Sequence, residues 1–266
     1  MGTDRATTAS GRPFTIGVIS ALPEEIAALL KRARLVERVD GQRFYESRLA
    51  GRAAILTAGG DGLRKAARGI RVLLERFEVD CVLGLGIAGG LTSGLAAGDL
   101  LAGEEVRGPE GPPATADGSL LECARRCSTP VHFGTLLSVP DLITAAGEKQ
   151  TMGHAIAGAG AVDLESAAWM RAAAAAGKPS LVVRAIFDDA EESLPGYLSA
   201  ASGGEEGVNR GRLLRHAIAH PSTWRSLVRM WRRMTQSAER LASFAGSFAG
   251  SLDLPGDDEP GGAGGL

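Results

Sequence analysis

Residues 63–77 read LRKAARGIRVLLERF and residues 80–87 read DCVLGLGI, and these two segments decide the fold class. In the first segment, apolar side chains recur at the spacing of one helix face, so we expect an amphipathic helix. The second segment is a continuous apolar run, which is typical of a strand that is covered on both faces. A helix that leads into a buried strand is the repeating unit of a helix-covered, mostly parallel sheet.

The same alternation continues on both sides of this unit. Further strands are expected at residues 14–20, 100–105, 133–139 and 181–187, with two more inside 43–58 around a turn at Gly51. Further helices are expected at 23–33 and 164–176. The predicted fold class is therefore α/β, as a single domain of three layers in which helices flank a central mixed sheet.

The composition excludes several classes of protein. With 44% hydrophobic residues among 266, the chain can bury a substantial core and is not disordered throughout. Its 29 basic and 31 acidic side chains give a net charge of -2, so no nucleic-acid partner is expected. No apolar run reaches the ~18 residues that span a bilayer. Because residues 1–13 also lack the apolar core of a secretory signal, we expect a cytoplasmic protein.

The cysteines give no sign of cross-linking or metal binding. Cys81, Cys123 and Cys127 are odd in number, and no companion Cys or His completes the spacing of a zinc site. Free thiols are usual in a reducing compartment. We therefore expect neither a disulfide framework nor a metal.

The two ends of the chain differ from its middle. Residues 1–13 and the Gly- and Asp-rich residues 250–266 are expected to be disordered tails around a folded domain at 14–249. Near the end of that domain, residues 222–244 predict a helix whose apolar stripe faces away from Arg225, Arg229, Arg232 and Arg233. This basic amphipathic helix either packs on the core, with Trp224 and Trp231 buried and its arginines in solvent, or lies at an anionic membrane surface or partner.

Residues 84–89, GLGIAG, match the glycine spacing of a dinucleotide-binding turn. We discount a nicotinamide or flavin site, because further glycines follow where a helix should begin. No strand ending in an acidic residue follows about 20 residues later either. The remaining interpretation is a glycine turn whose backbone approaches another group closely.

Acidic side chains follow several of the predicted strands. They are, in chain order, Glu24, Glu25, Glu165, Asp188 and Asp189. In an open α/β sheet ligands bind beyond the carboxyl ends of the strands, so these acids could converge on one crevice. Each could instead be a charge that stabilises a helix N-terminus. Arg184, inside the apolar run at 182–186, needs an anionic partner if it is buried.

Five motifs stand in a fixed order along residues 14–190. They are IGVISALPEE at 16–25, GDG at 60–62 before KAA at 65–67, GIAGGL at 86–91 before GD at 98–99, VDLE at 162–165, and VRAIFD at 183–188. In this order they resemble the nucleoside phosphorylase-I superfamily, and above all its branch of nucleosidases that cleave methylthioadenosine and adenosylhomocysteine. The resemblance implies a nucleoside phosphorylase-like fold and an enzyme acting on a small-molecule nucleoside. A homodimer is the expected assembly.

A narrower resemblance covers the segment after the last motif. DDA at 188–190 leads to LP at 194–195, and LLRH at 213–216 and HP at 220–221 precede the Arg-rich helix. This pattern is similar to that of the hopanoid-associated phosphorylases, whose members are assigned to removing adenine from adenosylhopane. It implies a lipid-linked nucleoside as substrate.

The family resemblance implies roles for four charged residues. Asp188 matches the acid that protonates the purine N7, which is needed because the base is a poor anionic leaving group. Glu165 matches the carboxylate that accepts both ribose hydroxyls. Glu25 matches the acid that positions and deprotonates the attacking water, and Arg184 matches its cationic neighbour. The residues that would line the base and sugar are Ala88, Gly89, Leu142, Ile143, Leu164 and Phe187.

The chain departs from the family pattern at several of these positions. Ile87 and Phe187 stand where the family often has Ser, Leu164 where it has Met, and Leu142 where it has Phe. A small polar residue at position 87 would help to hold phosphate, and no Arg stands in residues 84–90. We therefore expect water as the acceptor and no cofactor, with inorganic phosphate kept open as a co-substrate.

Together these patterns predict a purine nucleosidase that acts on a 5′-substituted adenosine, with adenosylhopane as the first candidate. The alternatives are a methylthioadenosine, adenosylhomocysteine or futalosine nucleosidase, and a phosphate-dependent purine nucleoside phosphorylase. A different class is a non-catalytic nucleoside-binding module with the same fold. A lipid-linked substrate would also place the protein against the inner face of the membrane.

Overall fold

The computed structural model describes residues 12–156, 158–196, 198 and 224–252. Its strands are β1 (Thr15–Ser20), β2 (Arg34–Val39), β3 (Gln42–Leu49), β4 (Arg52–Ala58), β5 (Cys81–Gly90), β6 (Leu100–Arg107), β7 (Ala114–Thr115), β8 (His132–Ser138), β9 (Ala159–Asp163) and β10 (Ser180–Asp188). Its helices are α1 (Ala27–Leu30), α2 (Leu63–Arg76), α3 (Gly118–Arg125), α4 (Ala146–Ala155), α5 (Ser166–Ala175) and α8 (Trp224–Ser251). Most of both predicted tails, and the motifs at 213–216 and 220–221, lie outside these residues.

Within the described residues, ten strands form one mixed sheet. Its order is β10-β6-β8-β9-β5-β1-β4-β3-β2, with β7 beside β6. β5 lies parallel to both β1 and β10, whereas β2, β3 and β4 are joined as antiparallel neighbours. Because β1, β5 and β10 run in the same direction, their carboxyl ends meet at one edge of the sheet.

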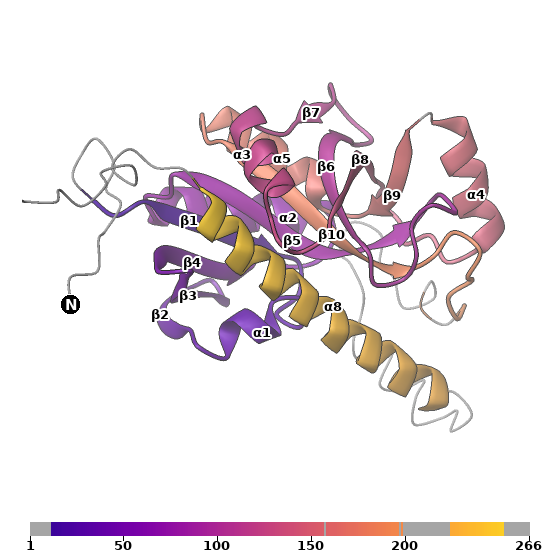
Figure 1. Ribbon diagram of the computed structural model, residues 1–266, viewed down its shortest axis with the longest axis horizontal. Coiled ribbons are helices and arrows are strands. Elements are labelled where there is room, and N and C mark those ends of the chain that lie inside the picture. Colours follow the sequence, from indigo (N-terminus) through magenta and orange to yellow (C-terminus); the bar gives the residue numbers. More distant parts are fainter. Residues whose placement is uncertain (1–11, 157, 197, 199–223, 253–266) are drawn as a thin grey trace, which may run out of the picture.

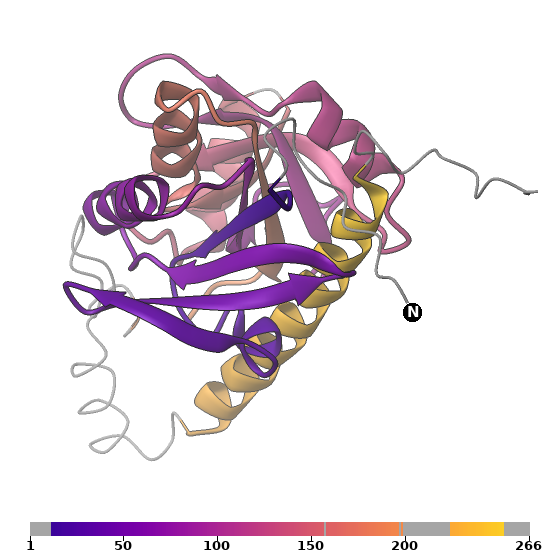
Figure 2. The same cartoon turned by 90° about the vertical axis from the view of Figure 1, so that its left-hand side faces the viewer.

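Helices cover both faces of this sheet (Figure 1). One core cluster joins the strands to α1, α3 and α8 and includes Leu29 and Phe248. A second cluster joins the strands to α2 and α5 and includes Ile70 and Trp169. Figure 2 shows α8 on one side of the strands and α2 on the other. The predicted three-layer α/β fold with a mixed sheet is confirmed.

Some predicted elements differ from the structure. The helix predicted at 23–33 contracts to the four residues of α1, because residues 22–26 form the turn that leaves β1. The sequence patterns also missed β2, β7, β9, α3 and α4. β2 is an exposed strand with charged residues, and α4 has only one buried side chain, so neither carries a clear apolar period.

The glycine turn expected at residues 84–90 is wrong, because the segment continues β5 to Gly90. A side chain at Gly84 would place its Cβ 2.7 Å from Val182 Cγ1 and 2.9 Å from Trp169 Cε3. Glycine at this position therefore lets the side chains of Val182 and Trp169 pack directly on the main chain of β5, which continues as a strand. The expected close approach is real, but it occurs without a turn.

Helix α8 has two distinct halves. Its C-terminal half is core, with Leu241 and Phe248 fully buried, and it continues to Ser251 instead of ending at residue 244. Its N-terminal half extends beyond the sheet in Figure 1. Trp224 is 61% and Trp231 65% exposed there, so the expectation that these tryptophans pack in the core is wrong. No helix in the described part of the chain is long and apolar enough to cross a bilayer.

Candidate active site

A cavity of about 260 Å³ lies at the edge where the carboxyl ends of β1, β5 and β10 meet. Further walls come from the ends of β8 and β9 and from α8. The residues that line it are Ala21, Leu22, Glu25, Asp61, Ile87, Ala88, Gly89, Val139, Leu142, Ile143, Val162, Asp163, Leu164, Glu165, Phe187, Asp188, Leu194, Leu198, Met230 and Met234. Most are apolar, and a few carboxylates converge among them, as in many small-molecule sites.

Nearly all of the candidate residues line this one cavity. They are Glu25, Ala88, Gly89, Leu142, Ile143, Leu164, Glu165, Phe187 and Asp188. Arg184 is not among the lining residues, because it lies behind Glu165 with its side chain fully buried. Glu24 and Asp189, which also follow strands in the sequence, do not line the cavity either.

Main-chain groups from two strand ends hold Glu25 in place. Its Oε2 accepts a hydrogen bond from the Leu22 N–H at 2.8 Å, and its Oε1 accepts one from the Ile87 N–H at 3.0 Å. Burial raises the pKa of Glu25, while nearby Arg184 and these N–H groups lower it. The carboxyl therefore fixes the loop after β1 against β5 and faces the cavity between them.

Arg184 is the buried cation at the centre of the site. Its Nε lies 2.7 Å from Asp163 Oδ2 and donates to Ser166 Oγ at 3.0 Å, while NH2 donates to Glu165 Oε2 at 3.4 Å. Its guanidinium carbon also stands 4.6 Å from the centre of the Trp169 ring. The anionic partners that a buried arginine needs are thus supplied by the turn between β9 and α5.

Asp163, and not Glu165, caps helix α5. Its Oδ1 accepts from the main-chain N–H groups of Glu165 at 3.2 Å and Ser166 at 3.3 Å, and from Ser138 Oγ at 2.6 Å. Glu165 occupies the N-cap position but makes no side-chain cap hydrogen bond. Glu165 is therefore at the helix N-terminus, as one of the two interpretations expected, but Asp163 makes the capping hydrogen bonds and the Glu165 carboxyl faces the cavity.

Glu165 sits among like charges. Its Oε1 accepts from the Gly62 N–H at 3.0 Å. Burial raises the pKa of Glu165 to about 8; Arg184 opposes this shift, and Asp163 and Glu25 add to it. Three carboxyls thus lie around one guanidinium, which favours the protonated form of Glu165.

Gly86 makes room for this arrangement. A Cβ at this position would lie 1.9 Å from Arg184 NH1 and 2.9 Å from Glu25 Oε1. NH1 is buried and has no hydrogen-bond partner within the described residues. Glycine at this position therefore lets both the Arg184 guanidinium and the Glu25 carboxyl approach the main chain of β5.

Asp188 ends β10 at an irregularity in the strand. The pairing with β5 shifts between Ile186 and Asp188, so that Asp188 lies beside Gly89. Its Oδ2 accepts a hydrogen bond from Lys149 Nζ at 2.5 Å. Burial raises the pKa of Asp188, and Lys149 opposes that shift.

Several residues of the site escaped the sequence analysis. They are Lys149, Asp163, Ser166, Met230 and Met234. Asp163 stands next to the recognised Leu164 and Glu165, and its position just before the predicted helix at 164–176 could have indicated a cap. The two methionines belong to the predicted amphipathic helix, but nothing in their spacing indicates that this helix reaches the cavity.

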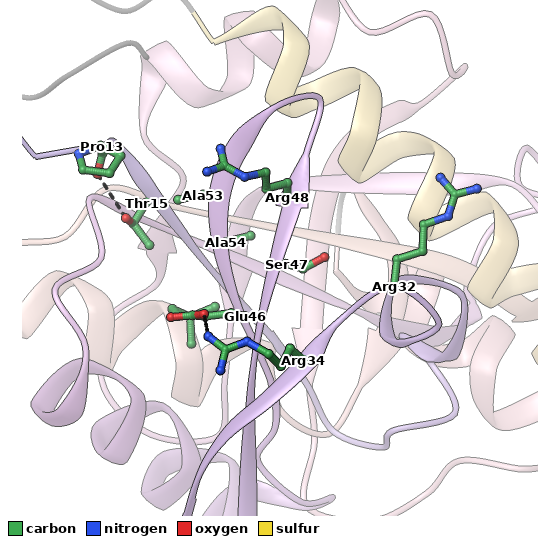
Figure 3. Close-up of a pocket in the computed structure, with 10 residues that line it drawn as sticks. Pro13, Thr15, Arg32, Arg34, Glu46, Ser47, Arg48, Ala53 and Ala54 are labelled. Carbon is green, nitrogen blue, oxygen red and sulfur yellow. Dashed lines mark hydrogen bonds and ion pairs between the residues drawn. The ribbon is translucent and has the colours of Figure 1, made fainter. Parts of the chain in front are cut away.

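A second, wider cavity of about 670 Å³ lies elsewhere, over β3 and β4. Figure 3 shows Arg32, Arg34 and Arg48 extending around it, with Arg34 paired to Glu46. Its charged residues are exposed or half-buried, so it lacks the desolvated groups of the smaller cavity. Within the described residues, no group of three or more His, Cys, Asp or Glu side chains is placed to hold a metal ion.

Known proteins are similar to this chain over most of its length. Residues 15–219 match the family model of the phosphorylase superfamily. A 5′-methylthioadenosine/S-adenosylhomocysteine nucleosidase of Exiguobacterium sp. is 30% identical over 217 residues, which are 70% of this chain and 92% of that protein. One from Aeromonas salmonicida is 35% identical over 144 residues, 51% of this chain and 60% of that protein.

Solved structures agree on the fold. The nucleosidase of Neisseria meningitidis, in complex with methylthio-immucillin-A, has a TM-score of 0.70 and 22% identity over 90% of this chain and 99% of that one. Futalosine hydrolase of Helicobacter pylori has a TM-score of 0.66 and 19% identity over 87% and 97%. The chain therefore belongs to the phosphorylase superfamily, as an enzyme related to the 5′-methylthioadenosine/S-adenosylhomocysteine nucleosidases.

Proposed function

We propose that this enzyme hydrolyses the N-glycosidic bond of a 5′-substituted adenosine and releases adenine. One observation carries the proposal. Glu25, Glu165 and Asp188 come from three distant parts of the sequence, yet they line one cavity, with Arg184 directly behind Glu165. These are the four charged residues to which the sequence motifs give roles in such a reaction.

Asp188 is the proposed general acid. Cleavage of the ribose–adenine bond gives an oxocarbenium-like sugar and a base that leaves poorly as an anion, so N7 must receive a proton. Burial favours the protonated form of Asp188 by raising its pKa. Phe187, which is 6% exposed, lines the cavity next to Asp188 and adds to the apolar surroundings of the acid.

Glu165 is the proposed ribose clamp. An ionised carboxylate has about four lone-pair sites, and Gly62 and Arg184 occupy two of those on Glu165. The remaining sites suit two hydroxyl donors. The negative charge also stabilises the cationic sugar that forms in the transition state.

Glu25 is proposed to hold the attacking water, with Arg184 as its cationic neighbour. Glu25 lines the cavity, so a water there could donate to its carboxylate, and the positive charge of Arg184, which lowers the pKa of Glu25, stabilises the ionised form that accepts the proton. Glu25 would take the proton as the oxygen attacks C1′. A carboxylate at this place disfavours a phosphate anion, which supports water over inorganic phosphate as acceptor.

Two kinds of 5′ substituent fit the proposal. The related proteins are named for methylthioadenosine and adenosylhomocysteine, or for futalosine, and these nucleosides are the first candidates. A second candidate is a hydrocarbon substituent, because Leu194, Leu198, Met230 and Met234 add an apolar wall to the cavity. Adenosylhopane, which would give ribosylhopane in hopanoid biosynthesis, is the example that the sequence motifs suggest.

A substrate panel tests the proposal. The enzyme would be incubated with methylthioadenosine, adenosylhomocysteine, futalosine and adenosylhopane, with and without phosphate, and the purine base and sugar product identified. We expect free base and a sugar with a C1′ hydroxyl in phosphate-free buffer. A sugar 1-phosphate formed only with phosphate would identify a phosphorylase. Tight binding without any base release would identify a non-catalytic nucleoside-binding module.

We also propose that α8 contacts an anionic membrane. Trp224, Val228 and Trp231 are 61%, 53% and 65% exposed, and the exposed Arg225, Arg229 and Arg232 lie beside them on the helix surface. Exposed tryptophans next to arginines are typical of helices that lie in the headgroup region. A lipid-linked nucleoside would require such a contact at the inner face of the membrane.

Liposome co-sedimentation tests this contact. Three arginines near an anionic surface contribute about 1 kcal/mol each, so replacing Arg225, Arg229 and Arg232 by Gln should weaken binding by roughly 100-fold. Arg233 is left unchanged because it pairs with Glu192 at 2.6 Å. The matched control replaces three other exposed arginines, Arg34, Arg68 and Arg76. Wild-type protein that stays in the supernatant at low salt would refute the contact.

The assembly and the domain limits stay predictions. Light scattering at several concentrations would test the expected homodimer. Limited proteolysis with mass spectrometry would test whether the protected domain spans residues 14–249, as the sequence predicts, or includes the last residues of α8.

A further inference from the structure

Helix α4 contributes one buried charge to the site. Lys149 is the only buried residue of this helix, and its side chain is 0% exposed. A lysine is almost never fully buried unless it is paired. Its ammonium donates to Asp188 Oδ2 at 2.5 Å and also to the carbonyl oxygen of Asp189. Lys149 therefore ties α4 to the end of β10, where the proposed general acid lies.

This contact orients the acid. Among the described residues, Lys149 is the one group that donates a hydrogen bond to the Asp188 carboxyl. On the β5 side, a Cβ at Gly89 would be in ordinary van der Waals contact with both carboxyl oxygens at 3.6 Å, so without one the main chain of Gly89 alone borders the carboxyl there. The carboxyl is thus held from one side by an ammonium and is free on another side that belongs to the cavity.

The charge of Lys149 also acts on the acid. Burial raises the pKa of Asp188; Lys149 and Arg233 lower it, and Glu192 raises it. Arg233 on α8 and Glu192 form an ion pair at 2.6 Å, so their effects on Asp188 oppose each other. Lys149, whose ammonium touches the carboxyl, is then the charged group that most opposes the effect of burial and favours the ionised form of Asp188.

We propose that Lys149 is a positioning residue for base release, which holds the Asp188 carboxyl toward the leaving purine and stabilises the carboxylate formed by proton transfer. In that step the Asp188 O–H proton moves to N7 as the bond between C1′ and the base breaks, and the bonding electrons stay with the base. Lys149 keeps its three protons throughout. The inference rests on the proposed function, because it assigns Lys149 a part in the same reaction.

Substitution of Lys149 by Met tests the role, since Met is similar in length and uncharged. We expect kcat to fall by about 10- to 100-fold, less than the loss from removal of the acid itself. Without the ammonium, Asp188 becomes a weaker acid, so the fall in kcat at high pH should move upward by about one pH unit. Lys149→Arg keeps the charge, so the pH at which kcat falls (the basic limb of the pH profile) should stay near its wild-type position.

A double-mutant cycle separates positioning from general structural support. If Lys149 acts through Asp188, Lys149→Met should cause no further loss of kcat in an Asp188→Asn background. The pH of the basic limb does not depend on the fraction of protein that is folded, so partial unfolding of Lys149→Met would not imitate the shift in that pH. Lys31→Met, at an exposed lysine, is the matched control and should behave as wild type.

The outcomes are distinguishable. An active wild type with an unshifted limb in Lys149→Met, or with additive losses in the double mutant, would overturn the role of Lys149 and leave the proposed function intact. Absence of base release by the wild type from every member of the panel would refute the proposed function, and this inference with it. A shifted limb with non-additive losses supports both.

Discussion

Gly86→Ala places one methyl group against the buried charges of the site. The added Cβ would be 1.9 Å from Arg184 NH1 and 2.9 Å from Glu25 Oε1, whereas ordinary contacts begin at 3.4 Å. The guanidinium cannot withdraw freely, because its Nε lies 2.7 Å from Asp163 and its NH2 contacts Glu165. The backbone of β5 is held on both sides by β1 and β10. The methyl group must therefore separate Arg184 from at least one carboxylate.

The expected cost follows from that separation. Breaking a buried ion pair costs about 3–5 kcal/mol. For a domain of this size, about 2–4 °C in Tm accompanies each kcal/mol, so Gly86→Ala should lower Tm by roughly 10 °C. Urea unfolding would give the free energy directly, and base release would show whether the displaced Arg184 also lowers kcat.

Two further variants make the test specific. At Gly94 an added Cβ meets only Thr92 Oγ1, at 3.9 Å, so Gly94→Ala is the matched control and should be close to neutral. In an Arg184→Met background the clash with NH1 is gone, so Gly86→Ala should cost much less there than in the wild type. If Gly86→Ala unfolds with the same free energy as Gly94→Ala, the packing of Arg184 against β5 is wrong.

Three other predictions concern the reaction itself. Asp188→Asn should lower kcat by about 10²–10⁴-fold while substrate still binds, because the amide can hydrogen-bond N7 but cannot protonate it; near wild-type kcat would remove Asp188 from the acid role. Glu165→Gln should raise KM for ribonucleosides, since one acceptor oxygen becomes a donor, and should abolish discrimination against 2′-deoxy substrates; a wild type that accepts both sugars equally would contradict the clamp. KM should fall as pH rises through about 8, the pKa of Glu165, because only the ionised carboxylate accepts both hydroxyls; a KM that is flat over this range, or a Glu165→Gln variant with the same slope, would count against it.

Much of the fold could be predicted from local patterns. The strands β5 and β10 are continuous apolar runs, α2 has a strong helical period and α5 a run of Ala, and their observed limits lie within a few residues of those expected. The convergence of acidic residues could be predicted once the strands were located, because parallel strands bring their carboxyl ends to one edge of the sheet. Elements without a clear period, such as α4, were missed since most of their side chains face solvent.

The sequence by itself therefore predicted the α/β class, the strands β1, β5 and β10 whose ends meet at the cavity, and Glu25, Glu165, Arg184 and Asp188 as candidate site residues. Only the tertiary structure decided that Asp163 holds Arg184, that Lys149 reaches Asp188 from 39 positions away, and that α8 supplies Met230 and Met234 to the cavity. The physical reason is the range of the interactions. Periodicity and capping act between neighbours along the chain, whereas a buried ion pair or a cavity wall depends on which distant segments the packed core brings together.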